Sequence, residues 1–278
     1  MSIKTAIASN IAALWTSEKR LLAERRRAET QRRKRSEPHV IDYSHQIDDP
    51  YSHLAAQGLL QLQARYEVKV RVHLVPPPAD WAAPERALLQ AYARLDATRL
   101  SEKSALPFLD PGAQPVFSRA EAAAAELADR LQAPDILTRL IDVGTRFWSG
   151  ESMPGPTPQG AAKASAAWAD GEATRTALGH FLGAVMHYGG EWYWGIDRLH
   201  YLEARLTELG CRRAGGPAHP IYAEPLVPAG HGAPNGERPV LHYYLSSAVP
   251  TPTSPPSGPR RWRTPMGRSF ACATSCRW

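Results

Sequence analysis

The sequence predicts an α/β protein in which a small sheet is interrupted by a long helical segment. The expected strands are rich in strand formers or alternate strictly between apolar and polar side chains, as the run E-V-K-V-R-V-H-L-V does. Two of them flank a Gly-Gly pair, which is typical of a hairpin turn. The region between the second strand and this hairpin has the composition of helices. The expected strands are residues 40–45, 67–75, 183–188 and 191–194.

Capping residues, prolines and glycines give the bounds of the expected helices. One helix is expected to begin at a capping box of Ser118 and Glu121, and the last is expected to be capped by Asp197 and to end at Leu209. The other expected helices are residues 3–35, 51–65, 82–103, 133–148 and 162–180. The predicted segments are a basic N-terminal helix at 1–37, a domain at 38–210 with a helical insertion at about 78–180, a linker at 211–238 and a further segment at 239–278.

The net charge of +6 belongs to the two ends of the chain. Residues 1–36 contain ten Lys/Arg and three Glu, residues 248–278 contain five Arg and no acid, and the residues between them carry −6. The folded domain is therefore not expected to bind nucleic acid. The basic helix is interpreted as a solvated arm, with contact to an anionic surface or to nucleic acid as the alternative. No segment is apolar enough to span a membrane, and no clean secretory signal is present, so a cytoplasmic protein is predicted.

Neither the cysteines nor the histidines have the spacing of a metal site or of a redox pair. The cysteines are Cys211, Cys272 and Cys276, the last two in the pattern C-x-x-x-C. The histidines considered are His45, His53, His187 and His200. They are scattered along the chain and are interpreted as hydrogen-bonded residues of the fold, so no metal cofactor is predicted.

Residues 49–52, Asp-Pro-Tyr-Ser, follow the first expected strand and open the first helix of the domain. Asp before Pro at a helix start is a capping arrangement, because the carboxylate accepts backbone N–H bonds and proline is preset for the first turn. The unpaired N–H groups and the helix dipole favour anions at such a position. The stretch is therefore a candidate site, and a plain N-cap is the alternative interpretation.

Residues 49–52 resemble the first βα unit of thioredoxin-like proteins of the DsbA and 2-hydroxychromene-2-carboxylate isomerase group, whose isomerase-like members carry Ser-Pro-Tyr-Ser there. Residues 190–199, G-E-W-Y-W-G-I-D-R-L, are similar to the G-E-x-F-W-G-x-D-R-L signature of the same group. The resemblance covers roughly residues 39–210. It implies a thioredoxin-like sheet of the DsbA type with a helical insertion, and a small thiol such as glutathione as partner or cofactor.

The resemblance places a site between residues 49–52 and residues 184–197. Asp49 and Ser52 stand at the catalytic positions. The substrate-binding residues that it implies are Pro50, Tyr51, His53, Ala184, Trp194 and Asp197. Trp192 and Trp194 share one face of their strand, and both are interpreted as core residues, with a wall of the substrate pocket as the alternative.

The chain departs from the family pattern in two ways. It has no cysteine at position 49 or 52, so dithiol exchange by the first domain is not expected. The carboxylate of Asp49 would repel a thiolate, although it could act as a base. The cis-proline position of the family falls on Ala184, where a trans bond is expected.

Three functions are compatible with this pattern. The chain is expected to be a cysteine-free thioredoxin-fold protein of the oxidoreductase and isomerase superfamily that binds a small thiol. The alternatives are an active glutathione-dependent isomerase of the 2-hydroxychromene-2-carboxylate type and a non-catalytic interaction module or damaged gene product. Glutathione binding separates the first two from the third.

Residues 240–243, Val-Leu-His-Tyr, repeat Val-Ile-Asp-Tyr of residues 40–43, and a second copy of the fold is expected to begin there. From Ala248 the pattern is lost. A shifted codon frame permits S-P-Y-T-Y-L-A-A followed by an alternating segment that ends in proline, in the order of the first domain. We interpret residues 248–278 as the frameshifted remnant of a second, truncated thioredoxin-like domain, with an ordinary disordered basic tail as the alternative.

Overall fold

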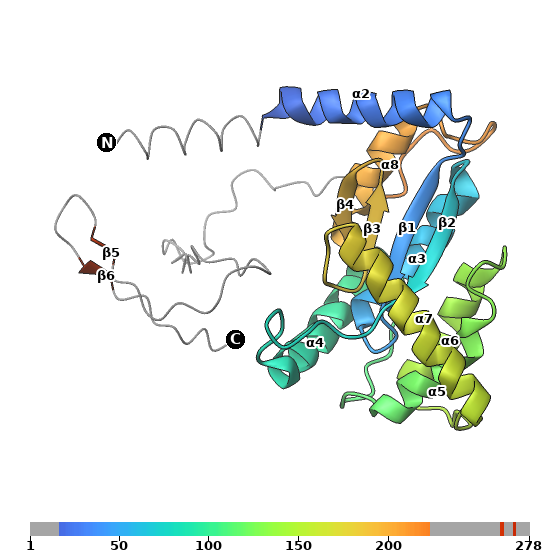
Figure 1. Ribbon diagram of the computed structural model, residues 1–278, viewed down its shortest axis with the longest axis vertical. Helices are drawn as coiled ribbons and strands as arrows, with labels where there is room; N and C mark the ends of the chain where they lie inside the picture. The colour runs from blue at the N-terminus through green and yellow to red at the C-terminus, as the bar shows by residue number, and fades with distance from the viewer. Residues whose placement is uncertain (1–16, 223–261, 264–268, 271–278) are drawn as a thin grey trace, which may run out of the picture. The chain divides into compact units, whose positions relative to one another are not determined.

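The computed structural model describes residues 17–222, 262–263 and 269–270 of the 278-residue chain. A four-stranded sheet lies at its centre, with the order β2-β1-β3-β4 (Figure 1). The strands are β1 (Val40–His45), β2 (Lys69–Leu74), β3 (Val185–Tyr188) and β4 (Glu191–Trp194). β1 and β2 are parallel, whereas β3 is antiparallel to both β1 and β4. This α/β architecture is the predicted thioredoxin-like one.

Helices occupy most of the remaining residues between 17 and 222. They are α2 (Glu18–Lys34), α3 (Pro50–Arg65), α4 (Arg86–Ser104), α5 (Phe117–Ala128), α6 (Ile136–Ser149), α7 (Pro158–Ala177), the short 3-10 helix η1 (Ile196–Arg198) and α8 (Leu199–Glu208). The crossover that parallel strands require is supplied by α3, between β1 and β2. α4 to α7 follow β2 and precede β3, which confirms the expected helical insertion.

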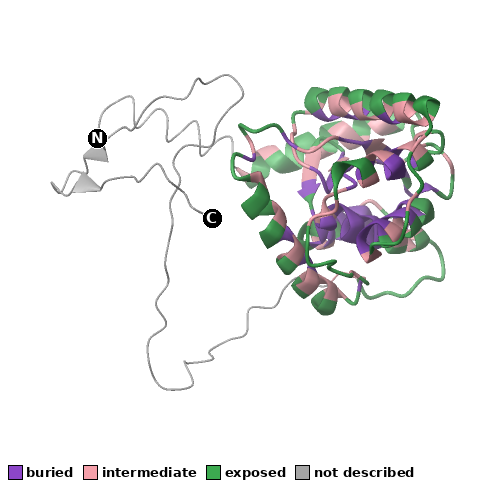
Figure 2. Ribbon diagram, turned by 90° about the horizontal axis from the view of Figure 1, so that it is seen from below, coloured by how far each residue is buried: buried purple, intermediate pink, exposed green. Residues whose placement is uncertain are grey.

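Alternation along the strands divides the sheet into an apolar face and a polar face. Ile41 and Tyr43 of β1 are fully buried, while Asp42 between them is partly exposed. β2 repeats the pattern, since Val70 and Val72 are buried and Arg71 is exposed. The period of two thus directs one apolar row to the core and leaves a polar row outside. In Figure 2 the buried residues gather at the centre, whereas α2 contains none.

α3 begins as the sequence predicts. The side chain of Asp49 accepts hydrogen bonds from the backbone N–H groups of Tyr51 and Ser52, and Pro50 occupies the first helical turn. Proline needs no N–H partner at this position, and its φ is already helical. Most of the helix is buried, because it contacts β1, β2 and α6.

The hairpin between β3 and β4 also agrees with the sequence. Gly189 and Gly190 have φ values of 59° and 88°, which is the left-handed region that a type I′ turn requires at both central residues. β3 and β4 then pair from Tyr188 with Glu191 to Val185 with Trp194.

Two predicted helix caps are wrong. α5 begins at Phe117, and its N-cap residue Val116 makes no side-chain capping bond, so Ser118 lies inside the helix and not at its cap. α8 begins at Leu199 after Arg198, and Asp197 lies in the preceding 3-10 turn. In α5 the ring of Phe117, the first residue of the helix, contacts that of Trp168 in α7, with centroids 5.6 Å apart.

Residues 211–222, where the sequence predicts a linker, contact this domain. Tyr66 and Arg212 form an isolated β-bridge. The carboxylate of Glu203 accepts hydrogen bonds from the backbone N–H groups of Ile221 and Tyr222, both at 2.8 Å. Residues 211–222 are therefore held to α3 and α8 by specific polar contacts.

Most of the predicted second copy at 239–278 and of the predicted disordered tail at 248–278 lies outside the described residues. Within it the structure has two short strands, β5 (Trp262–Arg263) and β6 (Ser269–Phe270), which pair antiparallel. Among the helices that the structure describes, none has the length and apolar character needed to cross a membrane.

Candidate functional site

The junction between β1, α3 and the segment before β3 contains three of the predicted site residues. Ser52 is fully buried at the first turn of α3. Its Oγ accepts hydrogen bonds from the backbone N–H groups of Gln46 at 3.2 Å and Ala184 at 2.9 Å, and it donates to Asp49 Oδ2 at 2.8 Å. The sequence predicted that residues 49–52 and Ala184 would meet, and these hydrogen bonds join them.

Ala184 has an unusual backbone conformation. Its φ is 54°, a left-handed value that costs an ordinary residue about 1–2 kcal/mol. Two hydrogen bonds hold it, because its N–H donates to Ser52 and its carbonyl oxygen accepts from the N–H of Gly195 at 2.8 Å. The peptide bond before Ala184 is trans, as expected. Backbone strain of this kind is commonly found at ligand sites, where the surrounding structure maintains it.

Gly183 and Gln46 complete this junction, although neither was among the site residues predicted from the sequence. A Cβ atom on Gly183 would lie 2.7 Å from Gln46 Cβ and 3.1 Å from Asp49 Oδ2, so only glycine allows the segment to come this close. The signal available in the sequence was a glycine just before a short strand, which often marks close approach of two backbones.

Asp49 is the ionisable group of the junction. Burial raises the pKa of its carboxyl group to about 7, against the opposing effect of the hydrogen bonds from Ser52 and Tyr51. The residue as a whole is nevertheless partly exposed to solvent. An acid with a pKa near neutrality at a helix N-terminus is suited to take up or release a proton at physiological pH.

Two aromatic side chains, one from the first turn of α3 and one from the end of β4, contact each other. The rings of Tyr51 and Trp194 lie edge to face, with centroids 6.3 Å apart. Trp194 is 50% exposed, so its interpretation as a core residue is wrong, and Tyr193 fills the core instead. The hydroxyl of Tyr51 donates to Asp96 Oδ2 of α4 at 2.9 Å, which fixes its ring.

The other predicted site residues lie in different surroundings. Pro50 is buried in the first turn of α3, and Asp197 is exposed in η1. His53 is buried and packs against Phe108 and α6, where a Cβ on Gly144 would overlap its Nδ1. Burial lowers the pKa of His53 to about 4, so its ring is neutral at physiological pH.

Within residues 17–222, Cys211 is a free cysteine. Cys211 is buried, and burial raises the pKa of its thiol to about 11, which disfavours the reactive thiolate. Among the same residues, no group of three or more His, Cys, Asp or Glu side chains is placed to hold a metal ion.

Comparisons with known proteins gave matches among solved structures. No protein-family model and no curated protein matches the chain. A 2-hydroxychromene-2-carboxylate isomerase structure is 19% identical over 62% of this chain and 96% of its own, with a TM-score of 0.44. The cytosolic disulfide reductase DsbM from Pseudomonas aeruginosa is 16% identical over 62% of this chain and 97% of its own, with a TM-score of 0.42.

The structure of DsbM with GSH is 15% identical over the same shares, with a TM-score of 0.41. In the present chain the strand order β2-β1-β3-β4 and the helices inserted between β2 and β3 define a thioredoxin-like fold of the DsbA type.

Proposed function

We propose that this chain is a cysteine-free thioredoxin-fold protein of the oxidoreductase and isomerase superfamily that binds a small thiol, such as glutathione, at the N-terminus of α3. The observation that carries the proposal is Asp49. Its carboxyl group caps α3 and has a pKa raised to about 7 by burial, while the residue as a whole is partly exposed. A group of this kind can accept the thiol proton while the helix N-terminus stabilises the resulting thiolate.

The proton transfer is energetically reasonable. An ordinary thiol has a pKa of about 8.5, so moving its proton to an acid of pKa about 7 costs about 2 kcal/mol. The thiolate would then face a neutral Asp49, which removes the charge repulsion that an ordinary aspartate would exert. Positive potential at the start of α3 offsets part of the cost.

The remaining residues have separate roles in this proposal. Ser52 is a positioning residue, because its hydroxyl is already engaged with Gln46, Ala184 and Asp49. Tyr51 and Trp194 supply an apolar wall for the body of the ligand. Glutathione-dependent isomerisation would use the same site, since Asp49 could also return a proton to a substrate carbon or oxygen during the reaction.

Calorimetry with glutathione tests the proposal. Near pH 7 we expect equal binding by the wild type and Asp49→Ser, because ionising the thiol costs the same in both. At pH 8.5 the thiol ionises without help in Asp49→Ser, whereas the ionised Asp49 of the wild type opposes it. The variant should then bind roughly fivefold more tightly, a screened difference of about 1 kcal/mol.

The matched control is Asp170→Ser, which removes an exposed carboxylate from α7 and should bind like the wild type at both pH values. Equal affinities of wild type and Asp49→Ser at pH 8.5, or no binding by either, would show that the site does not use Asp49 in this way.

Disulfide exchange is expected to be absent from this domain. Insulin reduction and thiol oxidation should remain at background, and Cys211→Ser should leave that background unchanged because the buried thiol ionises poorly. A large loss of activity in Cys211→Ser would contradict the assignment.

A further inference from the structure

A second candidate site lies at the other end of the sheet. A hollow of about 600 Å³ is bordered by the C-terminal half of α2, the first residues of β1 and β2, and the β3–β4 turn. Its volume is within the range of about 300–1,000 Å³ typical of small-molecule sites. Asp49 lies four residues beyond His45, the last residue of β1, whereas Val40 and Asp42 at the beginning of β1 line the hollow, so the two sites are distinct.

The lining is rich in cations. It contains five Lys/Arg and three Asp/Glu side chains. The cations are Arg32 and Arg35 from the end of α2, Lys69 and Arg71 from β2, and Arg205 from α8. The excess of positive charge is therefore built from elements that are far apart in the sequence.

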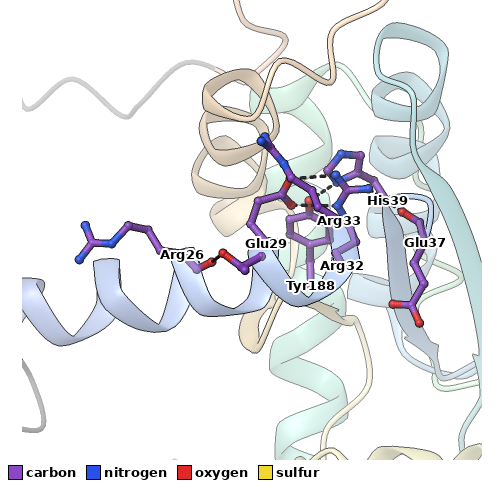
Figure 3. A network of polar contacts seen from close by, with 8 residues as sticks. Arg26, Glu29, Arg32, Arg33, Glu37, His39 and Tyr188 are labelled. Atoms are coloured by element: carbon purple, nitrogen blue, oxygen red, sulfur yellow. Dashed lines mark hydrogen bonds and ion pairs between the residues drawn. The ribbon is translucent and has the colours of Figure 1, made fainter. Parts of the chain in front are cut away.

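Two carboxylates in or beside the hollow, Glu29 and Glu191, each contact two arginines. Glu29 accepts hydrogen bonds from Arg32 Nη2 at 2.8 Å and Arg33 Nε at 2.5 Å (Figure 3). The hydrogen bond from Arg32 is the main reason that the pKa of Glu29 is lowered to about 2. The same arrangement occurs at Glu191, which is 2.7 Å from Arg25 and 3.3 Å from Arg205.

On the sheet floor, Asp42 also has two partners. Asp42 Oδ1 is 2.9 Å from His73 Nε2 and 3.5 Å from Arg71 Nη1, so the closer partner of Asp42 is the histidine. Lys69 makes no ion pair with any residue in the described part of the chain. Arg35 is 3.7 Å from Glu37, and the Arg35 side chain is 67% exposed. Arg35, Lys69 and Arg71 are therefore cations that the protein itself neutralises only weakly.

We propose that this hollow binds a small anion carrying two or more negative charges, either a phosphate compound or a dicarboxylate. Such an anion would be attracted by the uncompensated positive charge, and arginine side chains match the planar geometry of carboxylate and phosphate oxygens. Gly189 and Gly190 border the hollow without side chains, which allows a ligand to approach the turn closely.

The experiment titrates the full-length protein with inorganic pyrophosphate and, separately, with succinate, by calorimetry at about 0.1 M salt, where long-range attraction is largely screened. We expect saturable one-to-one binding of at least one of the two anions. The double variant Lys69→Gln/Arg71→Gln should weaken it about tenfold or more. Preference for pyrophosphate identifies the ligand as a phosphate compound, and preference for succinate identifies it as a dicarboxylate.

The matched control is Lys103→Gln/Arg130→Gln, which changes the net charge equally at exposed positions that do not line the hollow. It should change the affinity less than twofold. Because Arg71 contacts Asp42, the single variant Lys69→Gln, which disturbs no ion pair of the described residues, provides a second test and should also weaken binding. Absence of saturable binding, or equal weakening by the two double variants, would overturn the proposal.

Discussion

Carboxyl groups at the two ends of the sheet have pKa values that are shifted in opposite directions. At the carboxyl end of β1, Asp49 is surrounded by backbone and a serine hydroxyl, and burial raises its pKa to about 7. At the other end Glu29 lies between two arginines, which hold its pKa at about 2. The difference shows that desolvation without a cation produces a titratable acid, whereas paired cations produce a permanently charged one. The first arrangement suits proton transfer and the second suits binding of charge.

The largest effect in this comparison should come from Ser52→Ala. The change removes the partner of the buried Gln46 and Ala184 N–H groups and of Asp49, and the two donors would remain unsatisfied. We expect a loss of about 2–4 kcal/mol in the free energy of unfolding, measured by urea denaturation. Ser165→Ala on the exposed surface of α7 should change it by less than about 0.5 kcal/mol. Similar losses in the two variants would mean that Ser52 does not hold the junction.

The second largest effect concerns two glycines, one near each end of the sheet, whose replacement by alanine should lower stability by different amounts. Gly183→Ala would place a Cβ 2.7 Å from Gln46 Cβ, and we expect a loss of about 2 kcal/mol from overpacking. Gly190→Ala meets open space but has a φ of 88°, so only its backbone conformation is penalised, by about 1 kcal/mol. Thermal unfolding of both variants measures the difference, and an equal or reversed order would argue against close packing at Gly183.

Replacing the titratable acid should change how stability depends on pH. The pKa of Asp49 is higher in the folded state than its ordinary value of 3.8, so the folded state holds the proton more tightly. The wild type should therefore lose stability relative to Asp49→Asn as the pH rises from about 4 to 7, by roughly 1–3 kcal/mol. Asparagine retains the cap, and the comparison cancels the contributions of buried histidines. A difference that does not vary with pH would contradict the raised pKa.

The smallest effect should come from Glu29→Gln. Its effect on stability should depend on pH in the opposite direction to that of Asp49→Asn. The pKa of Glu29 is lowered from 4.5 to about 2, so its stabilisation is present above pH 4.5 and is lost as the pH falls towards 2. We expect Glu29→Gln to cost about 1 kcal/mol at pH 7 and nothing near pH 2. Guanidinium chloride would screen the ion pairs, so urea is the suitable denaturant. An unchanged stability at pH 7 in low salt would show that the two arginines contribute nothing through Glu29.

Local patterns in the sequence were enough to predict the main strands of the domain and the start of α3. β1, β2 and the hairpin of β3 and β4 follow from alternation and the Gly189-Gly190 pair, and the start of α3 follows from Asp49 and Pro50. These features depend on residues only a few positions apart. The false caps at Ser118 and Asp197 show the limit of such signals, because α5 and α8 begin at other residues and neither N-cap makes a side-chain capping bond.

The sequence by itself determined the order of strands and helices, the cap at Asp49 and the resemblance that paired residues 49–52 with Ala184 and Trp194. Only the tertiary structure decided that the Ser52 hydroxyl joins Ala184, 132 positions away, and that Glu191 meets Arg25, 166 positions away. It also decided the raised pKa of Asp49 and the cationic hollow beside α2. Both depend on burial and charge contributed by distant segments, and these properties do not exist until the chain has folded.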